Sequence, residues 1–218
     1  FNNTNKVFGM NYETVPAVYS NERLNSLSAD KSSAQQDFNS MLEVLNKWRL
    51  KNLKNSLETN KKPKFVMVCT SGGGVRSSLW TFHALQYADS ILGGELMRHI
   101  ALITGSSGGM IGAAYLREVY WQSLSDKAPL YSPSYLTDIS KDVLNSVAFS
   151  IATSDWFLSL QKVKYDDRGY NKDRGYIFER RIDNNMQNVF GSRRLSEYAQ
   201  TEADAIIPMM IFSPTIVN

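Results

Sequence analysis

Ser107 stands at the centre of a Gly-x-Ser-x-Gly pentapeptide, GSSGG, which follows a short apolar run at 100–104 and precedes a helix-like stretch at 110–124. A serine nucleophile needs this setting, because a sharp turn from strand to helix exposes its hydroxyl. Glycines two residues before and two residues after the serine leave room for its strained backbone. Gly105 and Gly109 meet that need, so the sequence predicts that Ser107 is a nucleophile.

Three consecutive glycines, Gly72, Gly73 and Gly74, follow an earlier apolar run, FVMVCT at 65–70. Glycines let main-chain N–H groups approach a reacting oxygen, and an acyl-transfer enzyme needs such donors, each worth about 3 to 4 kcal/mol of transition-state stabilisation. A phosphate cradle is a poorer interpretation. No Gly-Lys-Ser/Thr follows either turn, and Ser77 stands where the dinucleotide pattern has its third glycine. We expect the triplet to form an oxyanion hole.

A purely structural interpretation of the two turns stays open. Gly112, Ala113 and Ala114 follow the second turn, and small residues of this kind let a helix pack closely on a sheet. The turn glycines would serve the same packing without any chemistry.

Neither of the two histidines is expected to activate Ser107. His99 precedes the strand that leads to the serine, and strand residues rise about 3.3 Å each, so it lies roughly 26 Å away at the other end of the sheet. His83 lies about two turns into the helix after the glycine triplet, in a position typical of a packed or capping residue. The sequence therefore does not predict a Ser-His triad.

The order of these motifs resembles the patatin-like phospholipases, a family of lipid acyl hydrolases that includes the plant patatins and the cytosolic phospholipases. The resemblance rests on Ser71-Gly-Gly-Gly-Val-Arg76 after a strand and on the later Gly-x-Ser-x-Gly turn. It is firm from about Lys64 to Glu118 and looser beyond. The resemblance implies a three-layer α/β/α domain with a mainly parallel sheet, which acts on lipid or phospholipid esters through a Ser-Asp dyad without a metal or cofactor.

By that resemblance, Ser107 is the nucleophile and Gly72, Gly73 and Gly74 supply the oxyanion hole. Arg76 matches an arginine that organises the hole or meets the lipid phosphate. The chain departs from the plant-type pattern in having serine at position 71 instead of aspartate, although the related cytosolic phospholipases also have serine there. Ser77 replaces a further glycine.

The catalytic base is the largest departure. The family's aspartate is expected in an Asp-Gly-Gly or Asp-Gly-Ala turn, but none of the aspartates in this chain precedes a glycine. The segment 209–218, MMIFSPTIVN, resembles the strand before that region, so the aspartate is expected beyond Asn218 and the segment alone is expected to be inactive. Asp155, Asp167 and Asp173 are in-chain substitutes without the motif, each better explained as a solvated or turn-forming acid.

The amino-acid composition limits which classes of protein are possible. The 218 residues are 43% hydrophobic and carry 24 Lys and Arg against 21 Asp and Glu, which is typical of one globular domain and not of a nucleic-acid-binding protein. Cys69 is the single cysteine, so a disulfide framework and a Cys-based zinc site are excluded; we expect it to be buried. No stretch reaches the roughly 18 apolar residues of a spanning helix.

The pattern strand, glycine turn, helix occurs twice, and a third apolar run lies at 206–212. This repetition predicts an α/β architecture with a mainly parallel sheet and a site at the carboxyl ends of its strands. Residues 1–63 are expected to form an irregular arm to residue 32, an amphipathic helix at 33–53 and a basic linker. Residues 64–218 are expected to form the acyl hydrolase domain, incomplete at its C-terminus; the start at Phe1 likewise suggests an excised segment.

The sequence also predicts a helix later in the chain and contains a basic segment between Lys47 and Lys64. Thr137 or Asp138 is expected to cap a helix through 142–152. Between Lys47 and Lys64 basic residues far outnumber acids, as suits either anionic lipid or a solvated linker whose helix packs on the core.

A second candidate for membrane contact is the aromatic segment Trp156-Phe157-Leu158. It lies near Lys162, Lys164, Arg168 and Arg174, and buried core is at least as good an interpretation. Peripheral membrane association is therefore expected, with the cytoplasmic and cell-envelope compartments both open. A non-catalytic lipid-binding or scaffold domain, or a general esterase or peptidase, remain alternative functions.

Overall fold

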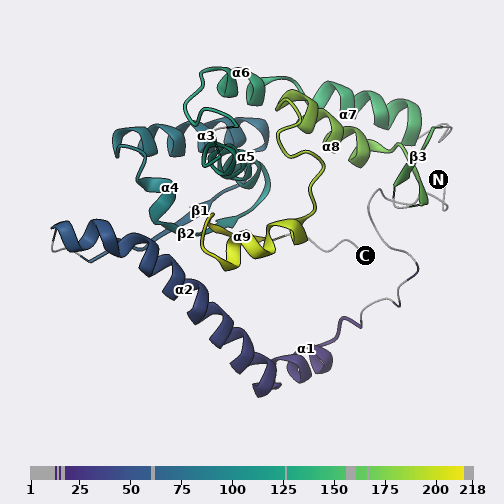
Figure 1. The fold of residues 1–218 in the computed structure, drawn as a ribbon. Helices are drawn as coiled ribbons and strands as arrows, with labels where there is room; N and C mark the ends of the chain where they lie inside the picture. Colours follow the sequence, from purple (N-terminus) through teal and green to yellow (C-terminus); the bar gives the residue numbers. More distant parts are fainter. Residues whose placement is uncertain are drawn as a thin grey trace. The chain divides into compact units, whose positions relative to one another are not determined.

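The computed structural model describes residues 13, 15, 18–59, 62–125, 127–155, 161–165 and 167–213. The chain divides into two compact units: residues up to Ala29 with 141–188, and Asp30–Ser140 with residues from Val189 onward. The helices are α1 (Asn21–Ser28), α2 (Lys31–Thr59), α3 (Gly74–Ile91), α4 (Leu96–His99), α5 (Ser107–Ser123), α6 (Ser134–Ser140), α7 (Leu144–Ser150), α8 (Arg174–Asn185) and α9 (Ala199–Ala203), with a π-helical turn at Ile151–Asp155 and a 3-10 turn at Leu195–Tyr198 (Figure 1).

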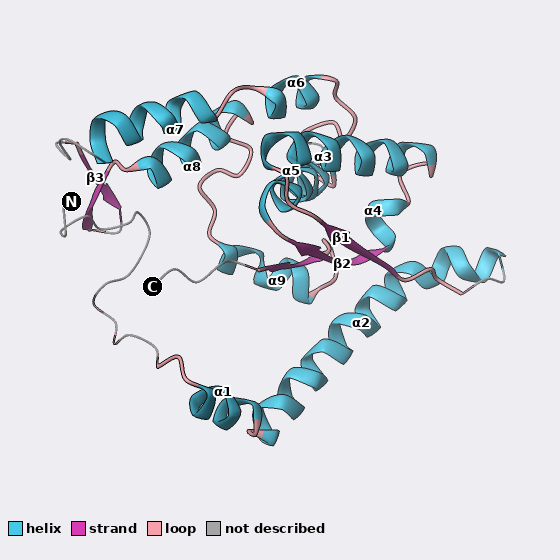
Figure 2. Ribbon diagram, turned by 180° about the vertical axis from the view of Figure 1, so that it is seen from behind, coloured by secondary structure: helices cyan, strands magenta, loops and turns pink. Residues whose placement is uncertain are grey.

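The larger unit is built on a three-stranded parallel sheet in the order β1 (Val66–Thr70), β2 (Ile100–Gly105), β5 (Met209–Phe212). Helices α3 and α5 lie over one face, and α2 and α9 lie on the other side (Figures 1 and 2). The predicted mixed α/β architecture with a parallel sheet packed between helices is therefore confirmed. Thr70 pairs with Gly105, so the two strands end together and both glycine turns leave the same edge of the sheet.

The core between α3, α5 and α6 is aromatic. The rings of Phe82 and Tyr115 lie 4.9 Å apart, and Tyr135 stands edge-on to Tyr115 at 5.7 Å. Phe82 and Tyr115 are almost completely buried. This cluster holds the two helices that follow the glycine turns in one position, because close-packed side chains resist displacement.

A helix is present where the sequence predicts one at 33–53, and it extends over Lys31–Thr59 as α2. Phe38, Met41 and Leu42 in its first half are exposed. Trp48 anchors it: the ring is 7% exposed and its Nε1 donates to the carbonyl of His99 at 3.2 Å. Lys47 pairs with Asp204 at 2.7 Å, and the Lys51 ammonium donates to the carbonyl of Ala205. Two cations of the basic segment therefore bind the protein itself, as the packed-helix interpretation requires.

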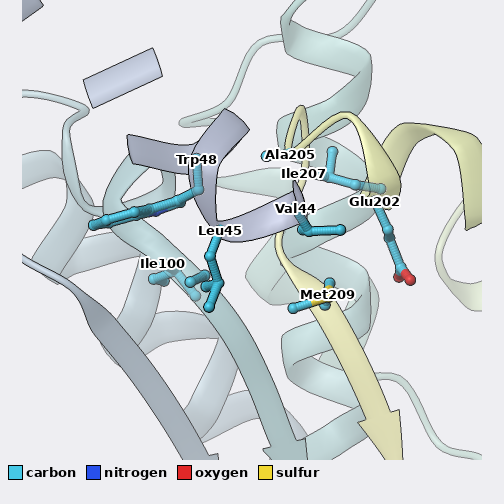
Figure 3. A pocket seen from close by; sticks show the side chains of 9 residues that line it. Val44, Leu45, Trp48, Ile100, Glu202, Ala205, Ile207 and Met209 are labelled. Atoms are coloured by element: carbon cyan, nitrogen blue, oxygen red, sulfur yellow. The ribbon is translucent and has the colours of Figure 1, made fainter. Parts of the chain in front are cut away.

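The cavity beneath α2 has a volume of only about 10 Å³ (Figure 3). Its lining includes Trp48, Ile100 and Met209, so it lies where β2 and β5 begin, at the opposite end of the strands from the glycine turns. This space holds one water molecule at most, and we assign it no ligand.

Buried ion pairs attach the segment after Val189 to α5. Arg117 is paired with Glu202 and also donates to the carbonyl of Pro208 at 3.1 Å. Glu118, only 1% exposed, accepts from Arg193 and from the hydroxyl of Tyr198. These buried charges are all paired, which fixes where the chain enters β5.

Two expectations for the helices need correction. The arm to residue 32 is not irregular throughout, because Ser20 accepts from the N–H of Arg23 and so caps α1. Thr137 and Asp138 lie inside α6 and do not cap the next helix. The N-cap residue of α7 is Val143, and the carboxylate of Asp142 before it accepts from the N–H of Asn145 at 3.2 Å.

The expectation that Cys69 is buried is wrong. Cys69 is exposed, and Met67 on the same face of β1 is 59% exposed. An apolar run favours burial, but β1 is an edge strand of the described sheet. Helix α2 covers this face only at the amino end of the sheet, where Trp48 packs against Phe65 at 5.1 Å.

The smaller unit contains an antiparallel hairpin, β3 (Lys162–Tyr165) and β4 (Arg168–Asn171), followed by α8. The carboxylate of Asp173 accepts from the N–H of Tyr176 at 2.9 Å and so starts α8. The amide of Asn185 donates to the carbonyls of Lys141 and Asp142, both at 3.2 Å, and thereby joins the end of α8 to the start of α7. Helix α2 packs on the sheet and belongs to the larger unit.

Stability is expected to fall between about pH 10 and pH 12. Burial, with the nearby Asp89 carboxylate, raises the pKa of Tyr120 to about 12. A raised pKa keeps the proton on the folded state while the unfolded state loses it above pH 10, so the stabilisation present at neutral pH is lost as the pH rises. The free energy of unfolding is measured with urea at pH 8 and pH 11.5 for the unmodified protein and for Tyr120→Phe. We expect it to fall by roughly 2 kcal/mol less in Tyr120→Phe. Equal falls in the two proteins would contradict the raised pKa of Tyr120.

Candidate active site

Ser107 begins α5 directly after β2, and its φ is 52°. This left-handed backbone is costly for any residue except glycine, by about 1 to 3 kcal/mol, and such strain is concentrated at functional positions. The serine is also exposed. The strained turn expected from the Gly-x-Ser-x-Gly pattern is therefore present at the residue expected to carry the hydroxyl.

Gly105 and Gly109 flank the serine, and the backbone of Thr70 and Ser71 lies so close that neither position has room for a side chain. A Cβ at Gly105, whose φ is 148°, would lie 2.1 Å from the carbonyl oxygen of Thr70. A Cβ at Gly109 would lie 2.4 Å from the carbonyl oxygen of Ser71. Both glycines thus have the packing role of the structural interpretation, and the same packing brings the two turns into contact.

The glycine triplet lies against the serine. A Cβ at Gly72 would be 3.2 Å from the Cβ of Ser107 and 3.7 Å from its Oγ. Gly73 and Gly74 have φ of 142° and 63°, values that side chains disfavour, and α3 begins at Gly74. Two helix N-termini, those of α3 and α5, therefore meet beside one hydroxyl, and their unpaired N–H groups favour negative charge there.

Two serines in the first turn of α3 hold this arrangement. The hydroxyl of Ser77 donates to the carbonyl of Ser71 at 2.7 Å and closes the glycine loop. The hydroxyl of Ser78 donates to the carbonyl of Gly108 at 2.8 Å and joins α3 to α5. Sequence reasoning missed Ser78, because a serine one turn into a helix carries no distinct signal.

Arg76 lies on the first turn of α3 and is exposed. Its guanidinium has no hydrogen bond or ion pair with the part of the chain that the structure describes. The side chain is thus available for an anionic group approaching the glycine turns.

No described residue forms a hydrogen bond with the hydroxyl of Ser107. His99 ends α4, at the amino end of β2, beside Glu95 at 3.9 Å. His83 is exposed on α3, with its ring 6.1 Å from that of Tyr87, so it is neither packed in the core nor a cap. Neither histidine is placed as a base, in agreement with the sequence.

The in-chain carboxylates have local roles where they are described. Asp167 lies at the turn of the β3–β4 hairpin with a φ of 59°, and Asp173 caps α8. The side chain of Asp155 lies outside the described residues.

The expected aromatic membrane segment, Trp156-Phe157-Leu158, lies outside the described residues. Of the cations near it, Lys162 and Lys164 are exposed on β3, and Arg168 pairs with Glu13 at 3.2 Å. Within the described residues, no helix is long and apolar enough to cross a membrane, and no three His, Cys, Asp or Glu side chains form a group that could hold a metal.

Comparisons with models of protein families, with curated proteins and with solved structures found no match.

Proposed function

We propose that this chain belongs to a patatin-like serine acyl hydrolase with a three-layer α/β/α domain, which cleaves ester bonds of lipids or phospholipids through an acyl-Ser107 intermediate. One observation supports this most directly: Ser107 has a strained φ of 52° at the start of α5, and Gly72 of the second glycine turn lies against its side chain. Close helix packing alone explains the glycines, but it does not require a strained, exposed serine at their meeting point.

In the proposed reaction, the Oγ of Ser107 attacks the ester carbonyl carbon and its proton passes to a carboxylate base. The carbonyl oxygen becomes an oxyanion, which main-chain N–H groups of Gly72, Gly73 and Gly74 stabilise. The tetrahedral intermediate collapses, the C–O bond to the alcohol breaks, and the alcohol leaves with the proton. Water then attacks the acyl-Ser107 ester, releases the fatty acid and restores the hydroxyl.

The base of this mechanism is an aspartate that the family resemblance puts beyond residue 218. A carboxylate suffices if it lies within hydrogen-bond reach of the Ser107 hydroxyl. Arg76 is proposed to meet the phosphate of a phospholipid. Peripheral membrane contact through exposed cations, such as Lys162 and Lys164, belongs to the same proposal because the substrate lies in an interface.

A fluorophosphonate probe tests the proposal, since it forms a covalent bond only with an activated serine. The full-length gene product is labelled beside Ser107→Ala and Ser106→Ala, and the adduct is located by peptide mass spectrometry. Ser106 is a matched control, because it is the adjacent exposed serine and its side chain makes no capping hydrogen bond. We expect one adduct, on Ser107, that persists in Ser106→Ala and disappears in Ser107→Ala.

The second candidate is a non-catalytic lipid-binding or scaffold domain of the same fold. It is favoured by one observation, the absence of any described carboxylate or imidazole bonded to Ser107. Full-length protein that binds phospholipid vesicles but takes up no fluorophosphonate would support this candidate and overturn the hydrolase.

A further inference from the structure

The smaller unit contains a groove of about 810 Å³ between α7, α8 and the start of the hairpin. Its walls include Phe149 and Ser150 from α7 and Ile177, Arg180 and Arg181 from α8. Residues three and four positions apart share one face of a helix, so α8 presents these side chains together. The volume lies within the range of about 300 to 1,000 Å³ typical of sites for small organic ligands.

The charged lining of this groove is positive. Lys172, Arg180 and Arg181 line it, and no described Asp or Glu does. Lys172 is half-buried and forms no ion pair with the described residues. The Nε of Arg181 donates to the carbonyl of Asp142 at 3.2 Å, which orients the guanidinium, whereas Arg180 lies 3.9 Å from the carboxylate of Asp183. Lys172 and Arg181 are therefore not neutralised by any described residue of the unit.

Ser150 adds an independent observation. It is 4% exposed, its hydroxyl has no hydrogen-bond partner among the described residues, and it lines the same groove. Buried hydroxyls are nearly always hydrogen-bonded, because the solvation lost on burial must be replaced. A ligand acceptor in the groove would supply the missing partner.

We propose that this groove binds a phosphate-bearing organic molecule. The phosphate lies among Lys172, Arg180 and Arg181 and accepts from the hydroxyl of Ser150. Arginine forks match phosphate oxygens in pairs, and several cations suit a dianion better than a single carboxylate. Phe149 is 70% exposed and receives the apolar part of the ligand. The inference does not depend on the chemistry of Ser107, because every group it uses lies within residues 141–188.

Calorimetric titration with phenyl phosphate tests the proposal. Inorganic phosphate and phenol, which each carry one part of that molecule, are titrated separately. The groove variant is Lys172→Gln/Arg181→Gln. The matched control is Lys162→Gln/Lys164→Gln, which removes the same charge from β3 in the same unit but outside the groove lining. We expect the groove variant to weaken phenyl phosphate binding by about tenfold or more and the control to change it less than about twofold.

Ser150→Ala separates a ligand contact from a structural role. We expect its thermal midpoint to be unchanged or higher, because an unpartnered buried hydroxyl is removed, and its affinity for phenyl phosphate to fall severalfold. An equal loss in the groove and control variants, or no binding by folded unmodified protein at 10 mM phenyl phosphate, would overturn the proposal.

Vesicles of phosphatidylcholine with and without phosphatidic acid identify the source of the phosphate. Lys162 and Lys164 contribute general attraction to an anionic surface, so the control variant also loses some binding to phosphatidic acid vesicles. A loss in the groove variant that exceeds the loss in the control assigns the site to a lipid headgroup. Binding of phenyl phosphate without vesicle binding assigns it to a soluble organic phosphate. Both results leave the Ser107 adduct unaffected, so this test and the test of the hydrolase fail separately.

Discussion

Ser107→Gly is expected to abolish acyl transfer and, at the same time, to stabilise the fold. Loss of the Oγ removes the nucleophile, for which a fall in turnover of about 10⁴-fold or more is expected. The φ of 52° at this position is strained for serine and free for glycine. Relief of that strain exceeds the extra entropy that glycine gives the unfolded chain, so the free energy of unfolding should rise by about 0.5 to 1 kcal/mol.

Ser106→Gly is the matched control for this prediction. Ser106 is also exposed, but its φ of −143° and ψ of 158° are ordinary extended values. Glycine there gains no relief of strain and adds flexibility to the unfolded chain, so we expect a loss of up to about 1 kcal/mol with acyl transfer retained.

Urea unfolding gives the stabilities, and hydrolysis of a fluorogenic fatty-acyl ester by the full-length gene product gives the turnover. If Ser107→Gly were less stable than Ser106→Gly, the claim that the backbone at Ser107 is strained would be contradicted. Full turnover in Ser107→Gly would instead contradict the proposal that Ser107 is the nucleophile. A stable, inactive variant is the combination expected where strain is retained for function.

The parallel sheet and both glycine turns could be predicted because their signals are local. Each strand–turn–helix segment shows a short apolar run followed by glycine and a helical pattern, and the two runs form β1 and β2. The strain at Ser107 was foreseeable for the same reason, since glycines at 105 and 109 leave room for a turn that other residues do not.

The exposure of Cys69 could not be predicted in the same way. An apolar run shows that a strand favours burial, but its cover depends on elements distant in sequence. Helix α2 reaches only the amino end of the sheet, where Trp48 contacts Ala101 and Ala205. The roles of Ser77 and Ser78 were hidden for a related reason, because each depends on a carbonyl acceptor supplied by another turn or helix.

The groove between α7 and α8 was also missed, although one signal was present. Ile177, Arg180, Arg181 and Asn184 follow helical spacing within GYIFERRIDNN, and all four line it. The partner wall comes from α7, about thirty residues earlier in the chain. Only the pairing of the two helices reveals that these cations surround one space.

Gly108→Ala is expected to destabilise the larger unit by about 3 kcal/mol or more. A Cβ at this position would lie 1.9 Å from the carbonyl oxygen of Gly74 and 2.7 Å from its carbonyl carbon, both closer than real Cβ contacts. Both partners are backbone atoms, so no side chain can rotate away and α3 and α5 must separate. Against a typical total stability of about 5 to 15 kcal/mol, that loss is severe.

Gly169→Ala is the control, because a Cβ there meets nothing within 4 Å and the backbone has no positive φ. We expect its thermal midpoint to stay within about 2 °C of the unmodified protein, whereas Gly108→Ala should lower the midpoint by roughly 6 to 12 °C. An unchanged midpoint in Gly108→Ala would mean that the two helices are not in backbone contact.

The same substitution also separates the two interpretations of the glycine turns. Separation of α3 from α5 moves the triplet at Gly72 away from Ser107, because each turn is continuous with its helix. If the triplet serves catalysis, the folded fraction of Gly108→Ala measured below its midpoint should react with fluorophosphonate at least about tenfold more slowly. If the glycines serve packing alone, stability falls and the rate of labelling per folded molecule stays the same.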